Sequence, residues 1–213
     1  MMKSPSSRAT EPGLPNGYDM FSRLAGDGIA LQKFGFHTTK AQVFRFANRF
    51  KVAAAFDRIQ LRGYAEPTNR AYGALFRILL TCSAVEQYQK ITALGWPQTE
   101  ELLSFAQRQE CLAAVRKADR EGKFFAAVQE RTARRGLATT VQECISGHRN
   151  EVTPLIRAVR HAFAHGDLAP GANSAAPGVA QKLAKTACPL LLNAIEADFE
   201  RRIEVVVAAP AAG

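Results

Sequence analysis

Residues 75–88, LFRILLTCSAVEQY, decide the fold of this chain. When they are placed on a helix, their apolar side chains point in nearly every direction, as in a helix that other helices surround. Pro67 suits the first turn of such a helix, and Gly95-Trp96-Pro97 is a sequence that stops one. We therefore predict a central helix over residues 70–93.

Helical periodicity also marks the chain on both sides of the central helix. Upstream, a long helix is predicted over residues 39–62, where Phe44 and Val52 lie off the main apolar stripe and indicate contacts on two sides. Pro189 should kink or split the last helix. Downstream helices are predicted over residues 99–106, 112–118, 123–132, 139–146, 150–166 and 177–207. Only residues 203–207 are ambiguous with a strand, so the predicted fold class is all-α, a multi-helix bundle.

The composition divides the chain into four parts. Residues 1–17 are rich in Ser, Pro, Gly and Thr with little to bury, which predicts a disordered tail, and residues 208–213 are expected to form another. Residues 18–66 are predicted to be an N-terminal helical extension. Residues 67–207 are predicted to form the main helical domain.

Charge and cysteine usage indicate the partner and the compartment. The chain has 213 residues, a net charge of +9 and a pI of about 9.7, which favours a polyanionic partner such as RNA. Its four cysteines are widely spaced among apolar neighbours, as buried free thiols are. No secretory signal or membrane span is evident. We expect a soluble protein of the reducing cytoplasm that does not bind membranes.

The residues suited to chemistry gather in positions 159–167, VRHAFAHGD, at a predicted helix end. At 100° per residue, Arg157, His161 and His165 form a row opposite the apolar side of this helix, and Arg160 lies at the border. Gly166 suits the left-handed position that ends a helix. The row should be available to a ligand or to a second subunit.

These residue types fit the cleavage of a phosphodiester. An arginine holds a phosphate through two parallel N–H donors, and a histidine moves a proton near neutral pH. A solvated face with favourable cations at the negative end of a helix is the alternative. The i, i+4 spacing of His161 and His165 also occurs in zinc sites, but no glutamate follows His161 and no third histidine comes later. We therefore expect no metal and no cofactor.

Glu86 lies in an apolar run of the predicted central helix, where a buried carboxylate must find a partner. An ion pair with Arg77, Lys90 or Arg160 is the favoured interpretation over direct catalysis. Through such a pair Glu86 could still orient the arginine.

The spacing of Arg160, four residues and His165, with a polar residue at position 161 and Gly166 after the last histidine, resembles the signature of the HEPN superfamily. The resemblance covers about residues 70–207 and includes the apolar helix with its embedded Glu86 and the terminal helix. Members of the family often carry Asn or Asp where this chain has His161, which leaves the role of that residue open.

The resemblance implies a HEPN-like bundle that acts as a metal-independent endoribonuclease of toxin or defence type. Two motif helices of a homodimer would line one cleft, and an antitoxin or other regulatory protein could hold the enzyme. His165 would be the general acid/base, Arg160 the clamp on the scissile phosphate, and His161 a positioning group. Attack by the 2′-hydroxyl of RNA would leave a 2′,3′-cyclic phosphate. The alternative is a HEPN-like module that binds RNA or protein without cleavage.

Overall fold

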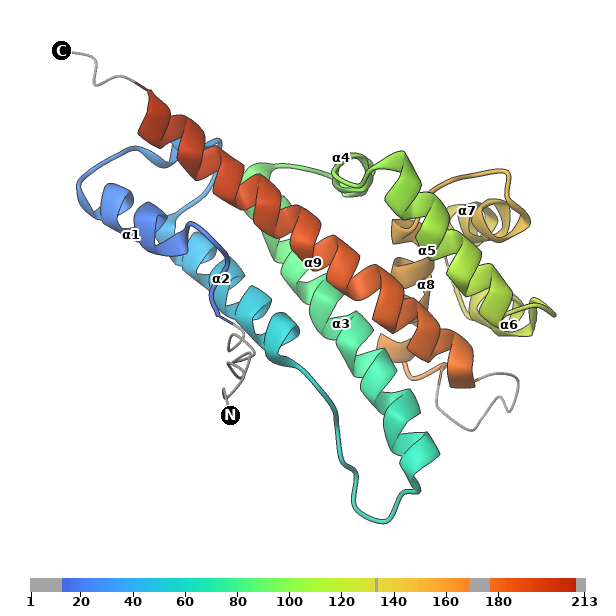
Figure 1. The fold of residues 1–213 in the computed structure, drawn as a ribbon. Coiled ribbons are helices and arrows are strands. Elements are labelled where there is room, and N and C mark those ends of the chain that lie inside the picture. Colours follow the sequence, from blue (N-terminus) through green and yellow to red (C-terminus); the bar gives the residue numbers. More distant parts are fainter. Residues whose placement is uncertain (1–12, 133, 169–176, 210–213) are drawn as a thin grey trace, which may run out of the picture.

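The computed structural model describes residues 13–132, 134–168 and 177–209, and every regular element in these ranges is a helix. The predicted all-α class is confirmed. The elements are α1 (Tyr18–Gly26), the 3₁₀ helix η1 (Leu31–Phe34), α2 (Lys40–Ala55), α3 (Glu66–Thr92), α4 (Trp96–Glu101), α5 (Phe105–Ala118), α6 (Lys123–Glu130), α7 (Arg135–Ser146), α8 (Thr153–Ala164) and α9 (Pro177–Ala208) (Figure 1).

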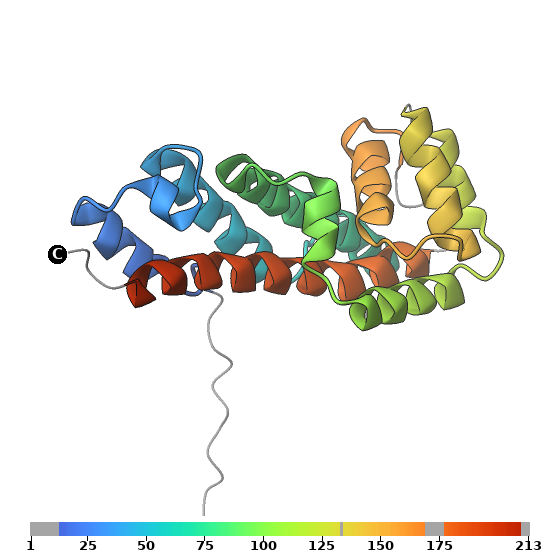
Figure 2. The same cartoon turned by 90° about the horizontal axis from the view of Figure 1, so that it is seen from above.

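Helices α3 and α9 lie side by side along the length of the molecule and organise everything else (Figures 1 and 2). Helices α1 and α2 pack at one end of this pair, and α5 to α8 at the other. The apolar side chains of α9 that repeat at helical spacing are buried, from Leu183 through Leu191 and Phe199 to Ile203. The central helix is also confirmed, because α3 contacts α2, α8 and α9.

One hydrophobic core joins the N-terminal helices to the rest of the chain. Phe21 and Phe36 are buried against Phe199 of α9, and Phe34 is buried against both of them, with ring centroids 5.3 to 6.1 Å apart. Such aromatic contacts add to the free energy gained from apolar burial. The N-terminal extension therefore shares its core with the helices that follow.

Helix α2 ends at Ala55, whereas the sequence predicted a helix through residue 62. Residues 56–65 have no regular structure because α3 binds their backbone. Arg77 donates from Nη2 to the carbonyl oxygens of Phe56 and Asp57, at 2.6 and 3.1 Å. These carbonyls are the hydrogen-bond acceptors that a longer helix would need for itself.

The expectation for Phe44 and Val52 is wrong, and of the two effects predicted for Pro189 the split does not occur. Phe44 and Val52 are 57% and 53% exposed, so α2 is contacted on one side only within the described residues. Pro189 does not split α9, which runs unbroken from Pro177 to Ala208. Helix α9 is held on both sides of the proline, because Thr186 contacts Cys111 of α5 before it and Asp198 contacts Tyr88 of α3 after it. Residues 203–207 are helical and not a strand.

Parts of the predicted tails and of the loop after the motif lie outside the described residues. Of the predicted N-terminal tail, residues 13–17 are described. They lie against α9, and the backbone N–H of Asn16 donates to Oε1 of Glu196 at 3.0 Å.

Candidate functional site

Helix α8 carries the motif and is fixed by packing and by its two ends. Leu155, Ile156 and Val159 are fully buried, toward α3 and α7. At its C-terminal end Gly166 has a φ of +80°, in the left-handed region that glycine tolerates. The backbone N–H of Asp167 donates to the carbonyl of Ala162 at 2.9 Å and closes the turn. The predicted helix end is therefore where the sequence placed it.

The N-terminal end of α8 is capped by a residue that the sequence did not single out. The sequence predicted a helix from residue 150, but the helix begins at Thr153. Glu100 of α4 provides both acceptors: its Oε1 and Oε2 accept the backbone N–H groups of Val152 and Thr153, each at 2.8 Å. A carboxylate at a helix N-terminus also gains from the helix dipole. The orientation of the motif helix therefore depends on α4.

A cavity of about 100 Å³, which we call the α8 cavity, lies where α3, α4, α7 and α8 meet. Its lining includes Arg157, Arg160 and His161 from α8. Arg134, directly before α7, adds a third arginine. The cavity thus gathers several cationic or titratable groups in a small space, with Glu86 as its carboxylate.

Glu86 forms an ion pair with Arg160, which was one of the three partners that the sequence left open. The distance from Nη2 of Arg160 to Oε2 of Glu86 is 3.2 Å, and about a third of each side chain is exposed. The pair orients the guanidinium toward the cavity. It also leaves other donors of Arg160 for a ligand, because a guanidinium carries five N–H groups.

Arg157 is held by an aromatic ring. Its guanidinium carbon lies 4.9 Å from the centre of the Trp96 ring, within the range of a cation–π interaction. Burial, and after it the charge of Arg134, lowers the pKa of Arg157 below its ordinary value of 12.5. Arg134, Arg157 and Arg160 thus place three guanidinium groups at the cavity, against one carboxylate, Glu86, among the described lining residues.

The two histidines of the motif meet at the end of α8. Their ring centroids are 4.4 Å apart, with 46° between the planes. Burial lowers the pKa of His161 below its ordinary value of 6.5, and His165, Arg134 and Arg160 lower it further, against a small opposite effect of Asp167. His161 is therefore neutral at neutral pH and can accept a hydrogen bond.

Two buried polar atoms at this site have no hydrogen-bond partner among the described residues. They are Nε of Arg160 and Nδ1 of His161. Buried polar groups are nearly always paired, so an unpaired one needs an explanation. Both atoms belong to adjacent motif residues, which is the pattern expected where a polar ligand, water or a partner chain completes the site.

The structure corrects the prediction that the motif row is an open face. Arg157 and His161 are half-buried beside α7, and only His165 of the row is exposed. The α8 cavity also includes Arg134 and Trp96, neither of which was predicted as a site residue. No local pattern could have assigned them to the site, because they reach it through the packing of α4 and α7 on α8.

The remaining chemistry of the site is restricted by what surrounds it. Burial, and then Cys188 and Glu86, raises the pKa of the Cys82 thiol well above its ordinary value of 9.0, so this thiol remains protonated.

Within the described ranges, no three His, Cys, Asp or Glu side chains gather as metal ligands do. In the same ranges, no helix combines the length and apolar character that a membrane span requires.

Compared with protein-family models, curated proteins and solved structures, the chain matches none of them. The chemistry of the site therefore has to follow from its own geometry.

Proposed function

We propose that the chain is a metal-independent endoribonuclease whose site is the C-terminal end of α8. One observation carries the proposal: Arg157, Arg160 and His161 line one small cavity, and the ring of His165 lies against that of His161. Arginines neutralise a phosphate and imidazoles move protons. The resemblance of this segment to the HEPN superfamily points to the same chemistry.

The proposed reaction uses the 2′-hydroxyl of RNA as the nucleophile. Its oxygen forms a bond to phosphorus while the bond from phosphorus to the 5′-oxygen breaks. His165, which is exposed, takes the hydroxyl proton and returns a proton to the leaving 5′-oxygen, so no net proton is consumed. The products are a 2′,3′-cyclic phosphate and a 5′-hydroxyl.

The other motif residues would stabilise this reaction. Arg160 binds the scissile phosphate and the negative charge that grows on it, while Glu86 keeps the guanidinium in place. His161 is neutral and its ring lies against that of His165 at a tilt, so it can hold the reacting imidazole or a phosphate oxygen in position. Arg157, held on Trp96, adds positive potential without direct contact to the reacting atoms.

The proposal includes a homodimer that pairs through the ends of α8. Ala164, His165, Gly166 and Asp167 are all exposed, so the motif is accessible to a second copy at this end. The four cysteines are buried free thiols, which is compatible with the reducing cytoplasm that we propose as the location. A regulatory protein such as an antitoxin would act by covering the same exposed end.

The decisive experiment compares His165→Ala with the wild type on labelled RNA in the presence of a chelator. We expect the variant to lose at least about a thousandfold in cleavage rate, since general acid–base catalysis contributes ~10²–10⁴-fold and the positioned imidazole is lost as well. Circular dichroism and the melting temperature should not change, because His165 is exposed. His37→Ala, which alters an exposed histidine at the other end of the molecule, is the matched control. Full activity of His165→Ala would disprove the assignment.

A second candidate function is an RNA-binding or protein-interaction module that cleaves nothing. The size of the α8 cavity favours it, because about 100 Å³ is less than the ~300–1,000 Å³ of typical small-molecule sites. Wild-type protein that retains RNA but never yields cyclic-phosphate ends would support this module.

A further inference from the structure

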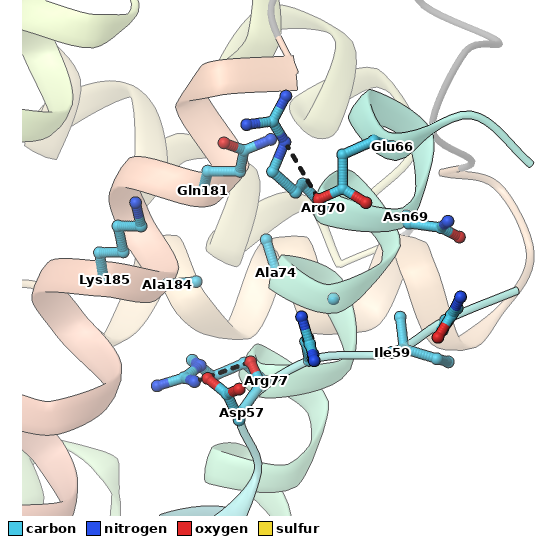
Figure 3. Close-up of a pocket in the computed structure, with 13 residues that line it drawn as sticks. Asp57, Ile59, Glu66, Asn69, Arg70, Ala74, Arg77, Gln181, Ala184 and Lys185 are labelled. Carbon is cyan, nitrogen blue, oxygen red and sulfur yellow. Dashed lines mark hydrogen bonds and ion pairs between the residues drawn. The ribbon is translucent and has the colours of Figure 1, made fainter.

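A second pocket, which we call the α3–α9 pocket, lies between the first half of α3, residues 57–60 and the start of α9. Its volume is about 380 Å³, within the range of sites that hold small molecules. Figure 3 shows Arg70 and Arg77 of α3 and Gln181 and Lys185 of α9 around it. The function proposed above does not use this pocket.

The wall formed by residues 57–60 is anchored at both ends by side chains of α3. Arg77 donates hydrogen bonds to the carbonyls of Phe56 and Asp57, where the wall begins. Asn69, which is 8% exposed, accepts the N–H of Leu61 on its Oδ1 at 3.0 Å and donates from Nδ2 to the carbonyl of Tyr64 at 3.3 Å. Hydrogen bonds to α3 therefore fix this wall of the pocket at both of its ends.

The charges around the α3–α9 pocket are unbalanced. Four cations line it, Arg58, Arg70, Arg77 and Lys185, against the carboxylates Asp57 and Glu66. Among the described residues the cations form one ion pair in the pocket, a long contact of 3.8 Å between Nε of Arg70 and Oε1 of Glu66, both well exposed. Exposed pairs of this kind contribute little. The excess of two positive charges matches the charge of about −1.5 to −2 on a phosphate monoester at neutral pH.

The floor of the pocket is small and apolar. Ala74 and Ala184 are buried beneath it, and Ile59 covers one side (Figure 3). Gly73 also lines it, although glycine inside a helix costs about 0.5–1 kcal/mol relative to alanine. A Cβ at Gly73 would lie 3.8 Å from Ile59, an ordinary contact, so packing does not require the glycine. Glycine here keeps the pocket open.

We infer that the α3–α9 pocket binds a small organic phosphate ester. The arginine and lysine side chains would hold the phosphate, Gln181 would supply a hydrogen bond, and the organic part would lie on the apolar floor. This pocket is separate from the α8 cavity. Arg77 and Glu86 differ by nine positions in α3, which places them about half a turn apart around the helix and ~13 Å along it. The inference is therefore independent of the nuclease proposal.

The test measures binding of phenyl phosphate, inorganic phosphate and phenol to the full chain by isothermal titration calorimetry. We expect wild-type protein to bind phenyl phosphate at one site and more tightly than inorganic phosphate, and not to bind phenol. The double variant Arg70→Gln/Lys185→Gln should weaken phenyl phosphate binding at least about tenfold, a loss of about 1.4 kcal/mol. Both side chains are exposed, so the fold should persist.

The matched control is Lys117→Gln/Arg120→Gln, which removes the same charge from exposed positions outside the pocket. It should leave the affinity within about twofold of wild type. Gly73→Leu places a side chain in the pocket and should abolish phenyl phosphate binding while weak inorganic phosphate binding remains. Either a failure of wild-type protein to bind phenyl phosphate, or an equal loss in the control variant, would overturn the inference.

Discussion

Arg160 and His161 are neighbours in the chain, yet each is controlled by groups from other helices. Glu86 of α3 orients the guanidinium, whereas Arg134, outside α7, acts on the imidazole through its charge. Arg160 and His161 each have one buried nitrogen without a partner among the described residues. At this scale the site is a set of polar groups whose states depend on residues remote in sequence.

The protonation of His161 can be measured directly. We expect the chemical shifts of its ring protons to titrate in NMR spectra with a pKa below 6.5. Arg134→Gln should raise that pKa by removing a nearby positive charge. The folded pKa is below the unfolded one, so the unfolded state binds the proton first as pH falls. Stability should therefore fall as pH drops from about 6.5 to the folded pKa of His161. A pKa that stays the same in Arg134→Gln would contradict this account.

At the scale of elements, carboxylates in the core join helices that are distant in the chain. Glu100 of α4 is 3% exposed and caps α8. Asp198 of α9 is 5% exposed and accepts hydrogen bonds from Tyr88 of α3 and from Arg202, so it joins the two central helices. Both contacts satisfy buried polar groups, and neither follows from the helical pattern of either segment.

Removing the charge at Glu100 should loosen α8. In Glu100→Gln one acceptor oxygen becomes an NH₂ group that faces a backbone N–H, so we expect a loss of about 1–3 kcal/mol in the free energy of unfolding. Urea titration would measure it, and hydrogen exchange should show faster exchange at the start of α8. The neighbouring Glu101 is exposed, and Glu101→Gln should change stability by less than about 0.5 kcal/mol. Equal effects of the two substitutions would refute the capping role.

Asp198 should contribute to the stability of the fold in a pH-dependent way. Burial raises its pKa, but hydrogen bonds from Tyr88, Arg202 and Arg201 outweigh burial and keep the pKa below its ordinary value of 3.8. The stabilisation is therefore present above that value and is lost as pH falls through the folded pKa. Asp198→Asn should reduce the free energy of unfolding at neutral pH by about 1–3 kcal/mol. It should also make that free energy fall less as the pH drops. Urea titrations of the wild type and of Asp198→Asn at about pH 7 and pH 3 would measure how much unfolding free energy each protein loses between the two pH values. Equal losses in the two proteins would show that Asp198 does not cause the loss of stability at acid pH.

At the scale of the whole molecule, α3 separates the two proposed sites. The α8 cavity and the α3–α9 pocket lie on opposite sides of α3, and each depends on residues from three or more segments. The single chain places one motif at an exposed end of α8. A shared site would need a second chain to approach that end.

The proposed dimer predicts complementation between two inactive variants. Arg160→Ala and His165→Ala should each lack activity alone, whereas coexpressed chains should form mixed dimers that retain one intact Arg160 and one intact His165. We expect measurable cleavage, well below that of the wild type, together with a dimer mass in sedimentation equilibrium. Mixed chains that stay inactive at every ratio, or a fully active monomer, would exclude a site shared between subunits.

The sequence by itself determined the helical class, the central place of α3, and the turn at Gly166 that ends α8. These follow from side chains three or four positions apart on one helix and from the backbone preference of glycine, which are local effects. Only the tertiary structure decided that Glu100 caps α8, that Glu86 pairs with Arg160, and that residues 56–65 leave the helix. Those outcomes depend on which segments pack together, because a buried donor or acceptor takes its partner from whichever helix or loop lies against it.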